Sequence, residues 1–238
     1  GLSALALTGI LWGSLGLVVR LLQDRGESTP AIAFWRLACA SVVLIPLLGL
    51  GTVRDLLRKV CRPGRLLAVA LASLAFQLFY FFSVQDVGVA VATLISLGLA
   101  PVAATAAEAL VARSRPPLRT VVVLALALAG LALVTGGAAP NAQVAPHPVR
   151  GVVEAILCAL AYAVATMWSA PLARRLGPLA VTFVSATVGA VALLPVVAVI
   201  GWQVPRTWPI VGGVLWLGLV ATVIAYGLFY FGLRSTPG

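Results

Sequence analysis

Charged side chains are scarce in this chain of 238 residues. Asp, Glu, Lys and Arg together make up only 9% of the sequence, whereas apolar residues make up 62%. A soluble domain usually carries about 25% charged residues, because its surface has to be hydrated. The scarcity of charge therefore excludes an ordinary soluble globular protein and predicts a protein that lies in a lipid bilayer.

Residues that bind metals or perform acid-base chemistry are also rare. The chain contains one histidine, His147, in a proline-rich loop, and three cysteines that form no CxxC pair. Because the cysteines are odd in number and lie in or next to apolar runs, a disulfide framework and a zinc site are not expected. We therefore predict no catalytic residues, no metal and no cofactor, and a protein that is not an enzyme.

The net charge of +10 would suggest nucleic acid as the partner of a soluble protein. Here the basic residues stand in short clusters between long apolar runs, rather than along one amphipathic face. Such clusters are typical of loops that orient a membrane protein. The predicted partner is therefore the lipid bilayer and not nucleic acid.

Eight apolar segments are long enough to span a membrane. A hydrocarbon core about 30 Å thick requires roughly 20 apolar residues per helix. The segments are 2–22, 31–50, 66–84, 87–112, 118–135, 152–172, 178–200 and 208–233. Their apolar runs are continuous, whereas strands of membrane β-barrels are about 10 residues long and alternate in polarity. The sequence therefore predicts an all-α, polytopic transmembrane helical bundle.

Basic charge alternates from one predicted loop to the next. The second loop is the most basic, with Arg54, Arg58, Lys59, Arg62 and Arg65 against Asp55. The fourth and sixth loops also carry an excess of arginine, whereas the first and third do not. Because cytoplasmic loops are enriched in Lys and Arg, the even-numbered loops are predicted to be cytoplasmic. This places the start of the first helix on the cytoplasmic side of a bacterial inner membrane.

The chain contains a weak internal repeat with an offset near 150 residues. Leu78–Phe81 recurs as Leu228–Phe231, and Pro30 at the start of the second span corresponds to Pro178 at the start of the seventh. Helices 1, 2 and 3 are thus predicted to repeat as helices 6, 7 and 8. Each repeat would contain five helices, which is an odd number. The two repeats would therefore cross the membrane in opposite senses, as an inverted-topology repeat.

Several motifs follow one another in a particular order and spacing. They are Gly9–Ser14, Pro30, Phe34–Leu37, Phe79–Phe82 and Ala90–Pro101. With these motifs the chain resembles, over nearly its whole length, the EamA-like permeases of the drug/metabolite transporter superfamily. The resemblance implies ten helices in inverted halves and secondary-active movement, commonly export, of small metabolites, amino acids or drugs. Many such permeases have a Gly-Glu pair at the end of helix 4, where this chain has Val111–Arg115.

The repeat and the resemblance together predict a domain organisation. Residues 1–136 are the first EamA-like repeat (helices 1–5), residues 137–150 a periplasmic linker, and residues 151–238 the second repeat (helices 6–8). Counterparts of segment 87–135 would fall beyond residue 238, so eight of about ten helices are expected. The predicted function is export of a small-molecule solute by alternating access. The alternatives are a non-transporting membrane scaffold and a membrane-embedded enzyme acting on lipids.

Polar and aromatic side chains deep in the spans are the candidates for solute binding, because inverted-repeat transporters hold their solute near the midplane. The candidates are Trp12, Gln77, Tyr80, Thr93, Ser96, Tyr162, Tyr226 and Tyr230. Gln77 and Tyr80 share one helix face and offer an amide, a hydroxyl and a ring face. The alternative roles are hydrogen bonding between helices, aromatic packing and close packing of small residues.

Two charged residues, Arg36 and Glu108, lie inside predicted spans. A charge in the membrane is energetically costly, so each residue is a candidate for coupling solute movement to protons or another ion. Arg36 stands about six residues into the second span, and Glu108 stands near the end of the fourth, close to Arg113 and Arg115. The alternative for both is a side chain that reaches out to the membrane interface.

Overall fold

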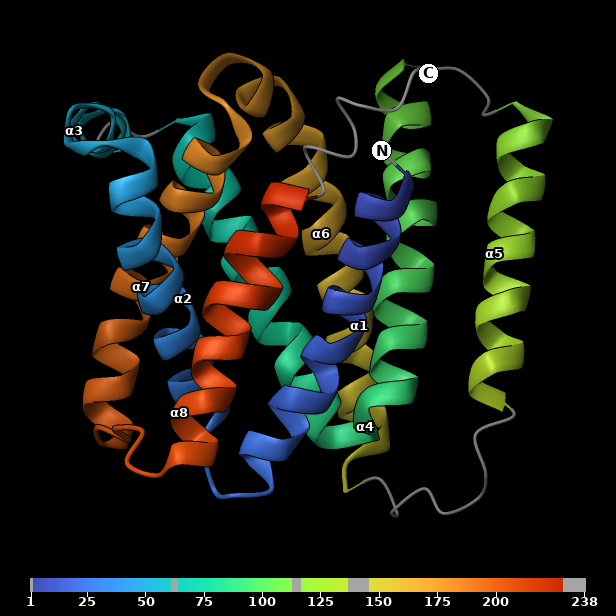
Figure 1. Ribbon diagram of the computed structural model, residues 1–238. Coiled ribbons are helices and arrows are strands. Elements are labelled where there is room, and N and C mark those ends of the chain that lie inside the picture. Colours follow the sequence, from blue (N-terminus) through green and yellow to red (C-terminus); the bar gives the residue numbers. More distant parts are fainter. Residues whose placement is uncertain (1, 61–63, 113–116, 137–145, 229–238) are drawn as a thin grey trace. The chain divides into compact units, whose positions relative to one another are not determined.

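The computed structural model describes residues 2–60, 64–112, 117–136 and 146–228, and every secondary-structure element in these ranges is helical. The helices are α1 (Leu2–Gln23), α2 (Thr29–Leu48), α3 (Leu50–Val60), α4 (Arg65–Ala112), α5 (Leu118–Gly136), α6 (Pro148–Leu176), α7 (Pro178–Ile200), α8 (Trp208–Leu215) and the π-helix η1 (Trp216–Ile224) (Figure 1). The π-helix continues α8, and the α-helical backbone resumes after it as far as Leu228.

Six helical stretches in the described ranges are long and apolar enough to cross a membrane. They are Ala6–Gln23, Thr29–Leu48, Arg65–Ser96, Pro148–Ser169, Pro178–Ile200 and Trp208–Leu228. Because apolar helices of this length satisfy their own backbone hydrogen bonds in lipid, they are suited to the hydrocarbon core. The prediction of an all-α polytopic membrane protein is confirmed.

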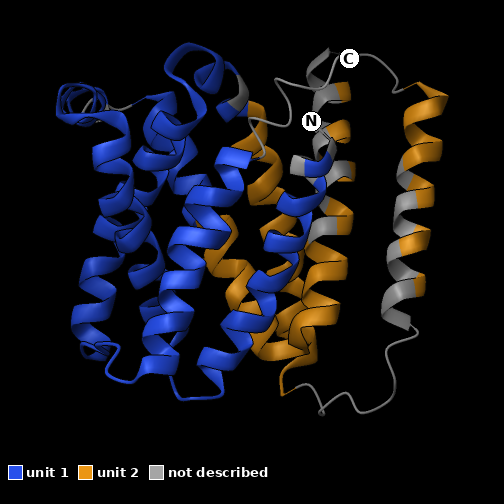
Figure 2. Cartoon of the chain, in the orientation of Figure 1, with its two compact units in different colours: residues 1–74, 168–238 blue, residues 75–167 orange. Residues whose placement is uncertain are grey.

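The chain forms two compact units (Figure 2). Unit 1 comprises Gly1–Leu74 and Trp168–Gly238, and unit 2 comprises Ala75–Met167. The boundaries between the units lie within α4 and α6. Each unit therefore contains residues from both of the repeats predicted from the sequence, and the division into repeats stays a prediction.

In unit 1, α2 and α7 pack against each other in antiparallel directions. Ser41 near the middle of α2 meets Thr187 of α7, with 2.6 Å between the hydroxyl oxygens. At the start of α2, the indole of Trp35 donates to the carbonyl of Gln203, just after the end of α7, over 2.7 Å. Gly189 permits this approach, because a Cβ at that position would lie 2.7 Å from Leu37 Cδ1.

The π-helix η1 packs on α1 and α2 in the same unit. Leu217 is fully buried, and Gly218 lies directly against α2. A Cβ on Gly218 would stand 2.8 Å from Cys39 Cβ and 3.1 Å from the backbone carbonyl of Arg36. Because that carbonyl cannot move aside, only glycine fits at this point of η1.

In unit 2, the two parts of α4 form a helical hairpin. Gly88 has φ 80° and ψ 165°, outside helical values, and joins the two helical stretches. The hydroxyls of Tyr80 and Thr93 are 2.9 Å apart, although 13 residues of continuous helix would separate them by about 20 Å. The chain therefore reverses at Gly88, as Figure 1 shows where α4 passes from teal to green. This reversal lies next to the predicted boundary between spans 66–84 and 87–112.

Helix α6 packs on the α4 hairpin within unit 2. The Ser83 hydroxyl donates to the Gly151 carbonyl over 2.8 Å, and the Ser96 hydroxyl donates to the Ala155 carbonyl over 3.4 Å. Gly151 faces the turn of the hairpin closely, because a Cβ there would lie 2.5 Å from Val87 Cγ1. Small residues thus let the backbones approach, as is common between membrane helices.

Two local predictions were wrong. Segment 51–65 was interpreted as a loop, but most of it forms the amphipathic helix α3. Residues 148–150 were assigned to a linker, but α6 already begins at Pro148, because proline is well accommodated in the first turn of a helix. Averaged hydropathy overlooks a short amphipathic helix, since its charged residues offset its apolar face.

Candidate functional site

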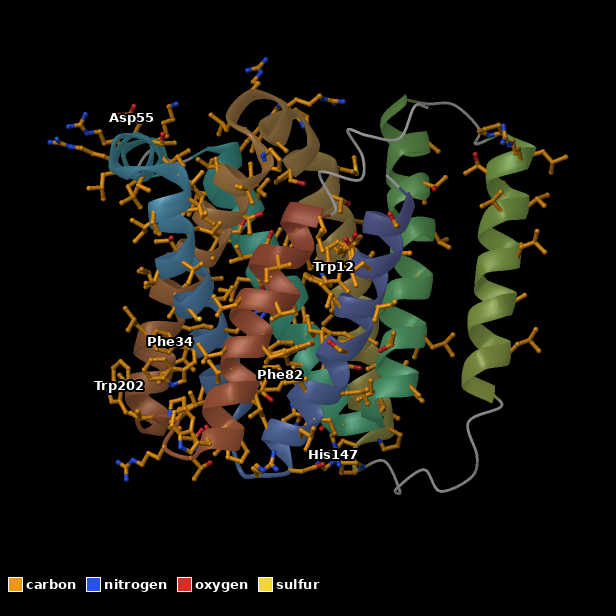
Figure 3. The ribbon with its side chains drawn as sticks, viewed as in Figure 1. Trp12, Phe34, Asp55, Phe82, His147 and Trp202 are labelled. Atoms are coloured by element: carbon orange, nitrogen blue, oxygen red, sulfur yellow. The ribbon has the colours of Figure 1, made fainter. Side chains whose placement is uncertain are left out.

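Two of the predicted binding residues meet in unit 1. The rings of Trp12 on α1 and Tyr226, shortly after η1, pack edge to face with centroids 5.3 Å apart and an interplanar angle of 66°. Figure 3 labels Trp12 on its helix. This geometry is favourable for aromatic pairs. It brings together residues that are far apart in the sequence.

Arg36 is a buried charge among the described residues of unit 1. Its side chain is only 7% exposed, and Nε donates to the Thr222 hydroxyl over 3.1 Å. Thr222 lies in η1, one turn before Tyr226. This burial favours a role inside the bundle over the alternative in which Arg36 reaches out to the membrane interface. We call Trp12, Arg36, Thr222 and Tyr226 the unit 1 cluster.

Thr222 owes its position to the π-helix. Its hydroxyl donates to the carbonyl of Leu217, five residues earlier, over 2.8 Å, while it accepts from Arg36. A π-helix is wider than an α-helix, is rarely longer than a single turn, and occurs frequently at functional sites. Sequence reasoning missed Thr222, because a single threonine in an apolar span gives no signal of a partner 186 residues away.

Further hydrogen bonds join α1 to the same region. The indole of Trp216 donates to the Ser14 hydroxyl over 3.0 Å, and the Thr8 hydroxyl donates to the Ala225 carbonyl over 3.4 Å. These bonds lie on either side of Trp12 along α1. They fix the helix that carries Trp12 against the helix that carries Thr222 and Tyr226.

Four other predicted residues, Gln77, Tyr80, Thr93 and Ser96, lie on the α4 hairpin of unit 2, and we call them the unit 2 cluster. Tyr80 and Thr93 are hydrogen-bonded to each other across the hairpin, and Ser96 is bonded to α6. These bonds correspond to the alternative role of hydrogen bonding between helices. Hydroxyls bonded in this way stabilise the packing of the unit.

Gln77 differs from its neighbours in the unit 2 cluster. The residue is 6% exposed, and within the described ranges Nε2 makes no hydrogen bond. A buried amide donor without an acceptor costs free energy. Such a group is suited to a hydrogen bond with a ligand.

The remaining predicted residues belong to neither cluster, and some of them lie outside the described residues. The ring of Tyr162 on α6 packs against Phe76, with centroids 5.1 Å apart, in unit 2. Tyr230 lies outside the described residues, as do Phe229 and Phe231 of the repeated segment Leu228–Phe231. Glu108 belongs to the helical backbone of α4, but its side chain is not described. His147 is exposed just before α6 (Figure 3).

A charged triad at one end of unit 2 was not predicted. Nε of Arg150 lies 2.8 Å from Asp86 Oδ2 and 3.1 Å from Glu154 Oε1. The single Nε–H is directed at Glu154, so the contact with the buried Asp86 is an ion pair without hydrogen-bond geometry. The four-residue spacing of Arg150 and Glu154 could have indicated their pairing. The contact with Asp86 depends on the reversal of α4.

The helical fold, the membrane-spanning lengths and the buried polar clusters define a polytopic helical membrane protein. A family model described as the EamA-like transporter family matches residues 1–136 and 149–238. The chain therefore belongs to the EamA-like transporter family, within the drug/metabolite transporter superfamily. The predicted resemblance is confirmed.

Individual proteins are also similar over most of the chain. The uncharacterized transporter YwfM of Bacillus subtilis is 28% identical over 235 residues, which cover 97% of this chain and 76% of the relative. An uncharacterized transporter of Archaeoglobus fulgidus is 29% identical over 238 residues, which cover 98% of this chain and 78% of the relative. A crystal structure of a protein with 21% identity matches 98% of this chain and 79% of its own, with a TM-score of 0.71, and shows a shared fold.

Proposed function

We propose that this member of the family is a secondary-active transporter, and not an enzyme, which exports a small metabolite, an amino acid or a drug-like solute by alternating access. One observation carries the proposal: a buried arginine, Arg36, is held against a π-helix in unit 1. An ionisable group inside a membrane bundle is retained at a high energetic cost. Its hydrogen bond to an irregular helix one turn from Tyr226 suits solute recognition.

In this proposal each unit by itself offers groups that suit solute recognition. Trp12 and Tyr226 offer ring faces, and Arg36 offers a guanidinium. Gln77 offers an amide donor, while Tyr80, Thr93, Ser96 and Tyr162 supply a polar and aromatic wall on unit 2. Tyr230, four residues after Tyr226 in the sequence, is proposed as a further contact. Ring faces together with a few polar groups are the usual composition of a small-molecule site.

The antiparallel contact of α2 with α7 supports the inverted repeat. These helices are the predicted counterparts of each other, and they run in opposite directions in unit 1. Counterpart helices of an inverted repeat are related by a pseudo-two-fold axis in the membrane plane. We propose that residues 1–136 and 151–238 are the two inverted repeats, and that rocking of the repeats exposes the solute to alternate sides.

We further propose that Glu108 and Arg36 couple transport to protons or another ion. A carboxyl group in α4 could bind a proton on one side of the membrane and release it on the other. The Glu108→Gln variant replaces the titratable carboxyl group with an amide that cannot bind or release the proton, and it keeps the size of the side chain. Solute flux measured across a pH series in proteoliposomes should lose its pH dependence in this variant. An unchanged pH dependence would exclude Glu108 as the coupling residue.

The proposed location is a bacterial inner membrane, with the start of α1 in the cytoplasm, as the loop charges indicate. The decisive experiment is solute uptake and efflux by the reconstituted protein, across a panel of amino acids, metabolites and cationic drugs. Gradient-driven flux of at least one class is expected, together with thermal stabilisation by the same solutes. If no solute of the panel gave either flux or thermal stabilisation, the proposal would be contradicted and a scaffold would be favoured.

A further inference from the structure

Helix α3 lies at the end of a membrane span. A single residue, Gly49, separates the end of span Thr29–Leu48 of α2 from the start of α3, and with φ 78° it turns the chain between them. Figure 1 shows α3 end-on beside α2 and α7, so its axis lies across theirs. A helix that crosses the end of a transmembrane helix in this way lies in the plane of the interface between lipid and water.

One side of α3 fixes it to unit 1. Val53 and Leu56 are buried, and the helix packs against α2 and α7. These two residues occupy one part of the apolar arc of the helix. They hold α3 in a constant orientation relative to the spans of unit 1.

A second side of α3 combines exposed leucines with arginines. Leu50 and Leu57 are 77% and 38% exposed. At about 100° per residue they lie within about 20° of each other around the axis, and Arg54 and Arg58 follow them at about 40° and 80° from Leu50. Both arginines are exposed. The exposed face of α3 therefore has an apolar strip bordered by two cations, and the acidic residue Asp55 lies away from it.

The charge around α3 is positive on balance. Lys59 and Arg65 are also exposed, and Asp55 is the single acidic residue in segment 50–65. Figure 3 shows nitrogen-tipped side chains near the labelled Asp55 pointing away from α2 and α7. Leucines that enter acyl chains beside arginines at headgroup height are the combination found in helices that bind anionic membrane surfaces.

We propose that the exposed face of α3 is a binding site for anionic phospholipid. Leu50 and Leu57 insert among the acyl chains, and Arg54 and Arg58 bind the phosphate group of the lipid. A guanidinium suits this role because its fork of N–H donors matches phosphate oxygens. The site is independent of the solute site, because it lies on the surface of unit 1 and involves none of the residues proposed for transport.

The test compares two double variants of the full chain in lipid nanodiscs made of phosphatidylcholine with 30% phosphatidylglycerol. The preference of the protein for spin-labelled phosphatidylglycerol over spin-labelled phosphatidylcholine is measured. In Arg54→Gln/Arg58→Gln this preference should fall by up to about 25-fold, since each of the two arginines near an anionic surface contributes roughly fivefold. The control Arg174→Gln/Arg175→Gln removes two exposed arginines at the end of α6 and should keep the preference.

Hydrogen exchange of residues 50–60 provides a second measurement. The exchange should be slower in nanodiscs that contain phosphatidylglycerol than in pure phosphatidylcholine, and inorganic phosphate should not reproduce the effect. Equal losses of preference in the two double variants would show a general effect of positive charge and overturn the site. A loss of preference in Arg54→Gln/Arg58→Gln without any effect of phosphatidylglycerol on the hydrogen exchange of residues 50–60 would also overturn the site. Binding of a copurifying protein to α3 in place of lipid would overturn it as well.

Discussion

The two units bury polar groups in different ways. Unit 1 contains a guanidinium, Arg36, hydrogen-bonded to Thr222 inside the bundle. In the unit 2 cluster the bonded groups are neutral hydroxyls, and a buried carboxylate of that unit, Asp86, is paired with Arg150 at the start of α6. A hydroxyl bonded to a neighbouring helix satisfies itself at low cost, whereas a buried charge requires a compensating function or partner. We therefore expect the guanidinium of unit 1 to contribute more to the proposed solute recognition than the hydroxyls of the unit 2 cluster.

The largest expected effect concerns Arg36. Arg36→Gln should lower solute transport about tenfold or more, because a hydrogen bond to a charged group contributes about 1.5–3 kcal/mol and a tenfold change corresponds to about 1.4 kcal/mol. Transport by equal amounts of reconstituted protein measures the effect. The control is Arg20→Gln, which removes an arginine that is paired with Asp24 on the surface of α1. Normal transport by Arg36→Gln would place the arginine among purely structural residues.

Close helix contact provides the second prediction. Gly218→Val should destabilise the protein by about 1–3 kcal/mol, because the new side chain would be forced against Cys39 and the backbone of α2. Gly212→Val in α8 is the matched control, since a Cβ at Gly212 meets no atom within 4 Å. Thermal unfolding in detergent measures both variants. Equal stability of the two would mean that η1 is free to move away from α2.

The ion pairs of the two units can be compared directly by double-mutant cycles. Asp86 and Arg150 in unit 2 should show a coupling free energy of about 1–2 kcal/mol, because Asp86 is buried although Arg150 is 57% exposed. Arg20 near the end of α1 and Asp24 just after it form a partly exposed pair four residues apart in unit 1, which should contribute about 0.3–0.5 kcal/mol. Chemical unfolding of the single and double variants gives both values. A larger coupling for the exposed pair would refute this ranking.

Gln77 separates stability from function within unit 2. Gln77→Leu should stabilise the protein by about 1 kcal/mol, because it removes a buried donor that has no acceptor in the described structure. The same variant should transport less solute if the amide binds it. Tyr80→Phe is the comparison, since it loses the bond to Thr93 and should destabilise by about 1 kcal/mol. A destabilised Gln77→Leu would show that the amide has a structural partner.

The smallest expected effect concerns Glu27, between α1 and α2. Partial burial raises the pKa of this carboxyl above its ordinary value of 4.5. The folded state then holds the proton more tightly than the unfolded chain, so the stabilisation is present below the unfolded pKa and is lost as pH rises through the folded pKa. The unfolding temperature at pH 4 minus the unfolding temperature at pH 7 should be slightly smaller in Glu27→Gln than in the unchanged protein. A larger difference in the variant would contradict the sign.

Several elements could be predicted because their cause is local. The bounds of α5 and α7 agree closely with the predicted spans 118–135 and 178–200, since a run of apolar residues between breakers is enough to define a membrane helix. The reversal at Gly88 was also close to a predicted boundary. Helix α3 was missed, although the spacing of Leu50, Val53 and Leu57 on one face could have indicated it.

The composition by itself determined that this chain lies in a membrane and forms helices, because the bilayer selects for hydropathy and length, which are properties of the one-dimensional sequence. Only the tertiary structure decided which polar residues meet. Arg36 and Thr222 are 186 positions apart, and their contact depends on the packing of α2 against a π-helix. Asp86 and Arg150 likewise meet because α4 reverses at Gly88 and α6 packs on the resulting hairpin. Contacts of this kind arise from the arrangement of the helices, which no local pattern encodes.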